Sequence, residues 1–126
     1  MLTVDGERIS VAYDAPAAGA SDDLVLVVSH GFTGGWRRPD NRAIALALKD
    51  FGGVVSYDSR GHGASSGRTT LGDQEVLDLD AAVGYARWLG ARRVATVGFS
   101  MGGSIVLRHA ALAATDARPQ AVVSVS

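Results

Sequence analysis

A single serine stands between closely spaced glycines in the stretch Gly98-Phe99-Ser100-Met101-Gly102. The G-x-S-x-G spacing fixes a tight turn between a strand and a helix, and this turn lifts the serine side chain out of the sheet. The glycines permit a strained backbone and a close approach of the helix to the strand. A serine placed there also lies at a helix N-terminus, where free N–H groups and the helix dipole favour a developing anion. The pattern predicts that Ser100 is a nucleophile, with Gly98 and Gly102 supporting its turn.

A simpler interpretation of the same stretch needs no chemistry. A glycine-rich turn before a helix can carry a serine merely as the N-cap residue. With 16 glycines in 126 residues, the spacing arises by chance roughly 0.2 times in a chain of this composition. The nucleophile is favoured because the motif lies between an apolar strand pattern at 94–97 and a helical pattern from residue 101.

A second glycine-rich turn, around His30-Gly31-Phe32, could stabilise the charge that such a nucleophile creates. A carbonyl attacked by Ser100 becomes an oxyanion, which needs two hydrogen-bond donors about 3 Å away. The N–H of Met101 can be one donor, and the other should come from the loop after the first buried strand. We therefore expect the N–H of Phe32 to be the second donor, with His30 and Gly31 supporting the turn. The alternative is a loop that only packs against its neighbours.

The base that a nucleophilic serine requires is not evident after Ser100. The only histidine and the only acid there are His109 and Asp116. His109 lies nine residues along the predicted helix, about 13 Å from Ser100 at 1.5 Å per residue, so it cannot be the base. We expect the acid and the histidine of a catalytic triad to lie outside this chain.

A third turn, Asp58-Ser59-Arg60-Gly61-His62-Gly63, combines with Gly67 into a pattern that could cradle a pyrophosphate. A dinucleotide-binding turn should lead straight into a helix and be followed by a strand that ends in an acid, and neither feature is present. The favoured interpretation is structural: Asp58 and Arg60 hold the loop in place, and its glycines allow the turns. A nucleotide-binding domain is kept as the least favoured alternative.

The elements that must position these turns follow from hydrophobic periodicity. Continuous apolar stretches predict buried parallel strands at 24–29, 53–57, 93–97 and 121–126. An alternating stretch around Asp5-Gly6 predicts an antiparallel hairpin. Helices are predicted from Asp40 or Asn41, from Asp73 and from residue 101, the first two with the apolar faces Ile44, Ala47, Leu48, Phe51 and Val76, Leu79, Val83, Ala86. The order predicts one α/β domain over 1–126, a doubly wound, mostly parallel sheet whose turns gather at the carboxyl edge.

Composition excludes several classes of function. The net charge is −1 and no basic stripe is present, which argues against a nucleic-acid partner. The chain has no cysteine, so it has no disulfide and no thiolate metal site, and we expect neither a metal nor a cofactor. The longest apolar run, residues 24–28, is too short to span a bilayer, and the first ten residues are not a signal peptide. A cytoplasmic location is the expectation.

The segments VVSHGF, YDSRGHGASSG and VGFSMGG together resemble the α/β-hydrolase superfamily, over nearly the whole chain. The RGHG-x-S form is similar to serine hydrolases grouped with monoacylglycerol lipases and serine aminopeptidases. The resemblance implies Ser100 as nucleophile, the amides of Phe32 and Met101 as oxyanion hole, and residues 121–126 as the sixth of eight strands. It also implies that His30 and His62 are structural neighbours of the site rather than bases, and that acid and histidine follow the serine in chain order.

The sequence thus predicts the N-terminal part of a serine hydrolase that cleaves a small-molecule ester, thioester or amide. The last predicted strand has no following helix to cover it, which favours an incomplete chain. Without its triad partners this fragment is expected to be inactive. The alternative is a non-catalytic binding or scaffold chain on the same fold. The sequence determines neither the substrate nor the oligomeric state.

Overall fold

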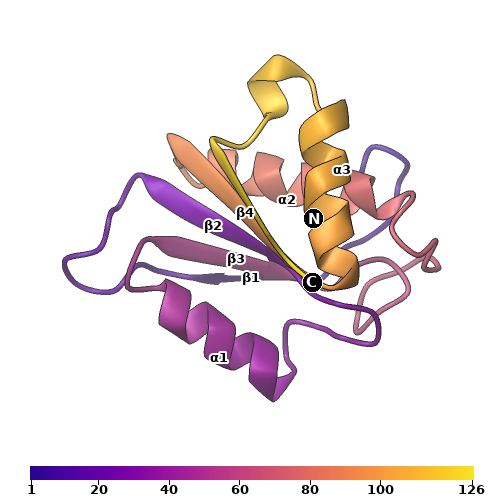
Figure 1. Cartoon of the computed structure of the whole chain (residues 1–126), viewed down its shortest axis with the longest axis horizontal. Helices are drawn as coiled ribbons and strands as arrows, with labels where there is room; N and C mark the ends of the chain where they lie inside the picture. Colours follow the sequence, from indigo (N-terminus) through magenta and orange to yellow (C-terminus); the bar gives the residue numbers. More distant parts are fainter.

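The computed structural model describes the backbone of residues 1–126 and every side chain except that of Asp116. The elements follow one another along the chain as β1 Val11–Asp14, β2 Leu24–Ser29, α1 Pro39–Leu48, β3 Gly53–Tyr57, α2 Glu75–Trp88, β4 Arg93–Phe99, α3 Met101–Leu112, a short 3₁₀ turn Thr115–Ala117 and β5 Ala121–Val125 (Figure 1). The predicted alternation of strands and helices is confirmed. The strand predicted as buried at 121–126 is wrong in its burial, because β5 forms an edge of the sheet and is largely exposed.

One five-stranded sheet has the order β1-β3-β2-β4-β5. β1 runs antiparallel to β3, and the other neighbours are parallel. The N-terminal hairpin is short: Leu2 and Arg8 form a single antiparallel bridge. Its turn is centred on Val4-Asp5, one position earlier than predicted, because Gly6 alone takes a positive φ, of 89°.

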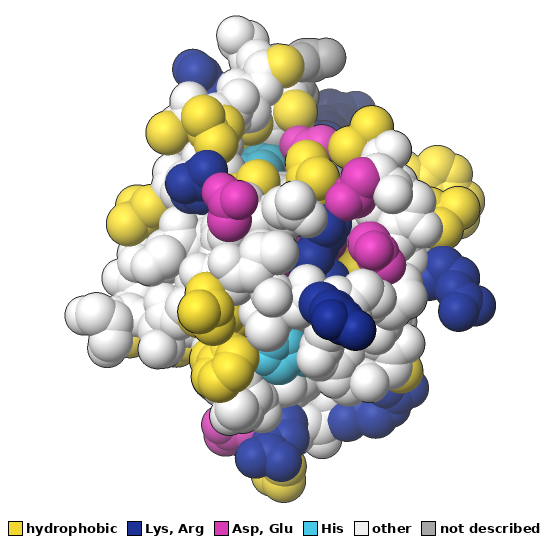
Figure 2. All heavy atoms as spheres, turned by 90° about the vertical axis from the view of Figure 1, so that its right-hand side faces the viewer, with side chains coloured by type: hydrophobic (Ala, Val, Ile, Leu, Met, Phe, Trp, Pro, Cys, Tyr) yellow, Lys and Arg dark blue, Asp and Glu magenta, His cyan; other side chains and the backbone are white. Residues whose placement is uncertain are grey.

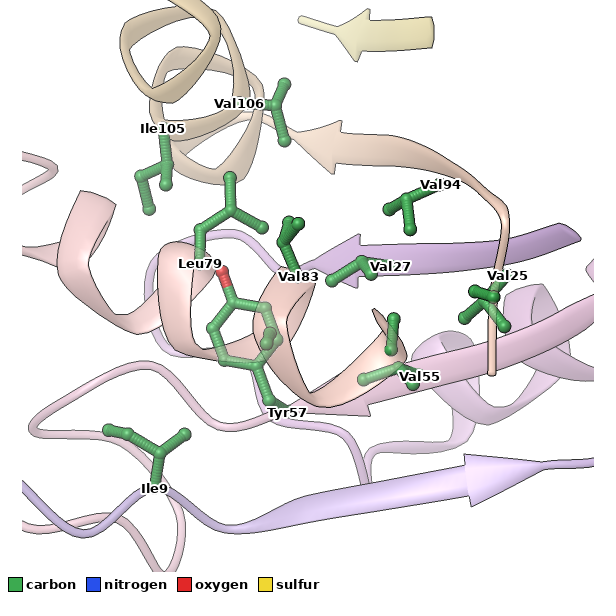
Figure 3. Packing of buried hydrophobic residues seen from close by; sticks show 13 residues of the cluster. Ile9, Val25, Val27, Val55, Tyr57, Leu79, Val83, Val94, Ile105 and Val106 are labelled. Atoms are coloured by element: carbon green, nitrogen blue, oxygen red, sulfur yellow. The ribbon is translucent and has the colours of Figure 1, made fainter. Parts of the chain in front are cut away.

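Helices cover both faces of the sheet, with α1 on one side and α2 and α3 on the other (Figure 1). The larger core lies between the sheet and α2 and α3, where branched side chains of β2, β3 and β4 meet Leu79, Val83, Ile105 and Val106 (Figure 3). A smaller cluster joins Ala45 of α1 to Val28 and Val54. Strands apolar on both faces require helices on both faces, which is why these segments read as continuous apolar runs.

The helix boundaries and faces differ in part from the expectation. α1 begins at Pro39, whose fixed φ suits a first helical position, and ends at Leu48. The predicted face of α1 was partly wrong: Ala47 and Phe51 are exposed, and Asn41 and Ala45 are buried instead. For α2, which begins at Glu75 rather than at an Asp73 cap, the predicted core positions Leu79, Val83 and Ala86 are confirmed and Val76 is half-buried.

β2 is the strand at which the chain reverses its direction across the sheet. The chain passes from β2 to β3 on one side, and then from β3 to β4 and β5 on the other. In open α/β sheets, ligands bind at such a point, outside the carboxyl ends of the strands. The turns that follow β2 and β4 therefore meet where a site is expected.

Candidate active site

Ser100 lies directly between β4 and α3, in a backbone conformation that a non-glycine residue seldom adopts. Its φ is 54° and its ψ is −115°. Such strain costs about 1–3 kcal/mol and persists only where the surrounding structure enforces it. Within the described part of the chain the Ser100 side chain makes no capping hydrogen bond to α3. This geometry disagrees with the simpler interpretation of Ser100 as an N-cap serine.

The glycines around Ser100 are required by close backbone contacts. A Cβ at Gly98 would lie 2.1 Å from the carbonyl oxygen of Gly102, and a Cβ at Gly102 would lie 2.1 Å from that of Ser29. The start of α3 is therefore pressed against the ends of both β4 and β2. The N–H of Ser100 donates to the carbonyl of Val125 at 2.7 Å, so β5 also holds the turn.

The turn after β2 lies against the serine. A Cβ at Gly31 would come within 3.4 Å of the Ser100 Cβ and 4.0 Å of its Oγ. Phe32, the predicted oxyanion donor, follows at once, and Met101 begins α3. Among the hydrogen bonds of the described residues, none uses the backbone N–H of Phe32 or of Met101. The structure thus brings Ser100 and the two predicted donor residues to one place, with both amides free.

A pocket of about 300 Å³ opens between this turn and α1. Its lining residues are Gly31, Phe32, Thr33, Gly34, Arg38, Asp40, Asn41, Ile44, Phe99 and Ser100. The start of α1 therefore faces Ser100 across the pocket. Figure 2 views the molecule from the side where the parallel strands of Figure 1 end, and this face carries both basic and acidic side chains.

A larger pocket, of about 400 Å³, lies next to this one, between the start of α1 and the loop after β3. Its lining includes Arg37, Pro39, Asp58 and Ala64 but not Ser100. We assign the candidate site to the smaller pocket, because Ser100, the predicted nucleophile, lines it and does not line the larger one.

Both ring nitrogens of His30 are occupied by backbone groups. The N–H of Ser59 donates to Nε2 at 2.9 Å, and Nδ1 lies 2.6 Å from the carbonyl oxygen of Gly31. The ring must therefore carry its proton on Nδ1, as donor to Gly31. Burial lowers the pKa of His30, which keeps it neutral. His30 has no free nitrogen with which to accept a proton from Ser100.

His62 is held in the same way. The N–H of Thr33 donates to its Nε2 at 3.1 Å, and its Nδ1 lies 3.1 Å from the carbonyl oxygen of Arg60. Its ring is edge-on to those of His30 and Phe32, with centroids 5.0 and 5.6 Å apart. Neither His62 nor His30 is placed to act as a base.

His109, the third histidine of the sequence, lies on α3 and points toward α2. Its Nε2 is 3.0 Å from a carboxylate oxygen of Asp80, in a second region of the molecule that Ser100 does not line. The side chain of Asp116, the other residue considered after Ser100, lies outside the described residues. None of the three histidines therefore serves Ser100.

The turn after β3 is filled by carboxylates rather than open to a phosphate. A Cβ at Gly63 would lie 2.2 Å from an Oδ of Asp58, and a Cβ at Gly67 would lie 2.7 Å from the carboxyl carbon of Glu7. The Asp58 carboxylate accepts hydrogen bonds from the N–H groups of Trp36 and Ala64. These glycines adjoin negative charge, which disfavours the nucleotide-binding alternative.

Arg60 fixes the same loop from within. Its buried guanidinium binds Asp78 and Asp5 through short ion pairs and also donates to Gln74. Hydrogen bonds from Arg60 lower the pKa of Asp5 to about 2, whereas burial raises the pKa of Asp78. This network joins the N-terminal turn, the loop after β3 and α2.

The sequence interpretation missed two features of the site. It did not identify the hydrogen bond between His62 and Thr33. It also did not identify Glu75 as the carboxylate that accepts hydrogen bonds from N–H groups of the loop before α2. The hydrogen bond of His62 could have been anticipated, because the RGHG segment and Ser29-His30-Gly31 both follow strands that end at the same edge of the sheet. Among the described residues no cluster of three His, Asp or Glu could hold a metal, and no helix is long and apolar enough to cross a membrane.

Comparison with known proteins agrees with this geometry. Residues 20–126 match the family described as serine aminopeptidase, S33. The chain belongs to this family. No curated protein sequence matches it.

Solved structures of α/β serine hydrolases share the fold. A lidless α/β serine hydrolase from Xanthomonas campestris is 29% identical with a TM-score of 0.79, over 92% of this chain and 54% of its own. An esterase from Pyrococcus furiosus is 31% identical with a TM-score of 0.76, over 90% of this chain and 45% of its own. Est1E from Butyrivibrio proteoclasticus, solved with bound ferulic acid, is 28% identical with a TM-score of 0.73, over 85% and 45%. The chain spans about half the length of these relatives.

Proposed function

We propose that this chain carries the nucleophile and the oxyanion hole of a serine hydrolase that cleaves a carboxylic ester, thioester or amide. The single observation that supports this most is the strained, uncapped Ser100 between β4 and α3, adjacent to Gly31. A serine that only capped α3 would take an extended backbone conformation and bond to the helix, and Ser100 does neither. A nucleophile that must stand clear of the sheet requires such a strained turn.

In this proposal the Ser100 Oγ attacks the carbonyl carbon, and its proton passes to a base. The carbonyl oxygen becomes an anion that accepts hydrogen bonds from the N–H groups of Phe32 and Met101. Collapse of this intermediate breaks the bond to the alcohol, thiol or amine, which leaves with the proton. Water then attacks the acyl-serine by the same route and releases the acid.

The base and its carboxylate partner are proposed to come from outside residues 1–126. All three histidines of the chain are either engaged by backbone groups or remote. The relatives are about twice as long as the chain, which leaves ample length for an acid and a histidine. By itself the 126-residue chain is expected to be inactive, because a serine without its base is a poor nucleophile.

The similarity to the Pyrococcus furiosus esterase favours an ester as substrate, and the pocket of about 300 Å³ fits a small acyl or alcohol group. A cytoplasmic location remains a prediction from the cysteine-free sequence. A non-catalytic binding role on the same fold remains the second candidate.

The decisive test is the hydrolysis of p-nitrophenyl butyrate by the complete protein and by its Ser100→Ala variant. Loss of one catalytic residue should lower kcat by about 10⁴-fold or more. A fluorophosphonate should label Ser100 in the complete protein, and it should label the Ser104→Ala control to the same extent. Equal activity of wild type and Ser100→Ala would overturn the proposal, whereas no hydrolysis and no labelling of the complete wild-type protein would favour the binding role.

A further inference from the structure

His62 lies at the point where two turns from different strands meet. It belongs to the loop after β3, yet its Nε2 accepts the N–H of Thr33 from the turn after β2, at 3.1 Å. Only 8% of His62 is exposed, and the rings of His30 and Phe32 contact its ring edge-on. The side chain therefore connects the loop after β3 to the residue that follows the predicted oxyanion donor.

The residue that His62 holds is strained. Thr33 has a φ of 63°, and Thr33, Leu71 and Ser100 are the non-glycine residues with positive φ in the backbone of residues 1–126. A branched side chain disfavours this conformation strongly, so surrounding contacts must enforce it. The hydrogen bond to His62 is the contact that the Thr33 amide makes.

Two successive peptide units of this turn are thereby fixed by two histidines. The carbonyl of Gly31 accepts hydrogen bonds from the His30 Nδ1 and from the N–H of Gly34. In a trans peptide the N–H points away from the C=O, so holding the Gly31 carbonyl directs the N–H of Phe32 the opposite way. His62 then fixes the next peptide unit through its N–H.

We propose that His62 is a positioning residue for oxyanion stabilisation, acting through the Thr33 amide on the direction of the Phe32 N–H. This inference rests on the proposed function. The effect requires an acceptor at the place of Nε2, because only an atom with a free lone pair, such as the unprotonated ring nitrogen or a carbonyl oxygen, can receive the Thr33 N–H. Loss of the acceptor would let the turn relax from its strained form and move the Phe32 N–H off the oxyanion.

Two amide side chains separate this role from simple packing. In His62→Gln the amide oxygen reaches the place of Nε2 and can accept the Thr33 N–H. In His62→Asn the amide ends near the place of Nδ1, so it can still bond to the Arg60 carbonyl but cannot reach Thr33. The matched control is the pair His109→Gln and His109→Asn, at a buried histidine away from Ser100.

The measurements are kcat and KM of the complete protein for p-nitrophenyl butyrate, and Ki for a trifluoromethyl ketone that forms an oxyanion on the serine. A lost oxyanion donor lowers kcat by about 100- to 1000-fold, so a displaced one in His62→Asn should lower it about 10- to 100-fold. KM should stay within about twofold, because the contact forms in the transition state. The kcat of His62→Gln should stay within about fivefold of the wild-type value. In each variant, Ki for the ketone should rise by the same factor by which kcat/KM falls.

Equal kcat for His62→Asn and His62→Gln would overturn the inference, as would a loss of the same size in His109→Asn. A change confined to KM or to Tm would show that His62 only packs the loop. Activity that persists in Ser100→Ala would instead refute the proposed function itself, so the two failures are distinguishable.

Discussion

The turns that follow β3 and β4 are both rich in glycine, but the glycines make room for different groups in the two turns. After β4, Gly98 and Gly102 let backbone meet backbone, and the one polar side chain, Ser100, remains without a capping partner. After β3, Gly63 leaves room for the Asp58 carboxylate, and Arg60 is paired with Asp5 and Asp78 and also donates to Gln74. A glycine-rich turn at a carboxyl edge therefore suggests chemistry when it leaves an exposed polar side chain without a partner, as at Ser100, and suggests scaffolding when its charged side chains are paired.

Of the substitutions that test this difference between the two turns, Arg60→Leu should change the free energy of unfolding most. Arg60→Leu leaves Asp78 buried without its cation, and breaking a buried pair in this way costs about 3–5 kcal/mol. Arg93→Leu is the matched control, because it removes an exposed ion pair with Asp23, which solvent screens, and should therefore cost much less stability. Urea denaturation of both variants measures the difference. Equal losses would show that the loop after β3 does not depend on its buried network.

A smaller effect is expected for the backbone contacts of the turn after β4. Gly98→Ala would place a methyl group 2.1 Å from the Gly102 carbonyl oxygen and should lower the free energy of unfolding by about 3 kcal/mol. Gly84→Ala, within α2, should raise it by about 0.5–1 kcal/mol, because the added Cβ would meet no atom within 4 Å outside its own turn of helix. Denaturation midpoints of the two alanine variants test this. If Gly98→Ala is as stable as wild type, the close approach of α3 to β4 is not needed.

The smallest expected effect is the pH dependence of stability that arises from His30, in the turn after β2. Burial lowers the pKa of His30 below its ordinary 6.5, so the unfolded chain binds the proton first. The stability associated with neutral His30 is thus complete above pH 6.5 and is lost as pH falls below it. The slope cannot exceed about 1.4 kcal/mol per pH unit for one proton.

Denaturation midpoints between pH 7.5 and 5 measure this slope, and His30→Gln, which does not titrate, should flatten it. A stability that increases as the pH falls through this range would contradict a neutral His30 and hence the hydrogen-bond assignment of its ring.

Much of the fold could be predicted because burial on both faces leaves a clear pattern. The apolar runs at 24–29 and 53–57 match β2 and β3, and the core positions of α2 were predicted from their spacing. The face of α1 was harder to predict, since its apolar residues fill more than one side. The helix ends three residues before Phe51 and so leaves that ring exposed.

The candidate site divides in a similar way. The sequence alone indicated Ser100, the turn around Gly31 and the meeting of their strands, because G-x-S-x-G and buried parallel strands impose local geometry. Only the tertiary structure decided which groups are satisfied and which are free. It engages both nitrogens of His30 and of His62, fills the glycines after β3 with carboxylates and leaves Ser100 uncapped. The bonds to the two Nε2 atoms join residues 29 positions apart in the chain, and the carboxyl group beside Gly67 belongs to Glu7. Local spacing carries no information about which polar groups such distant contacts will pair.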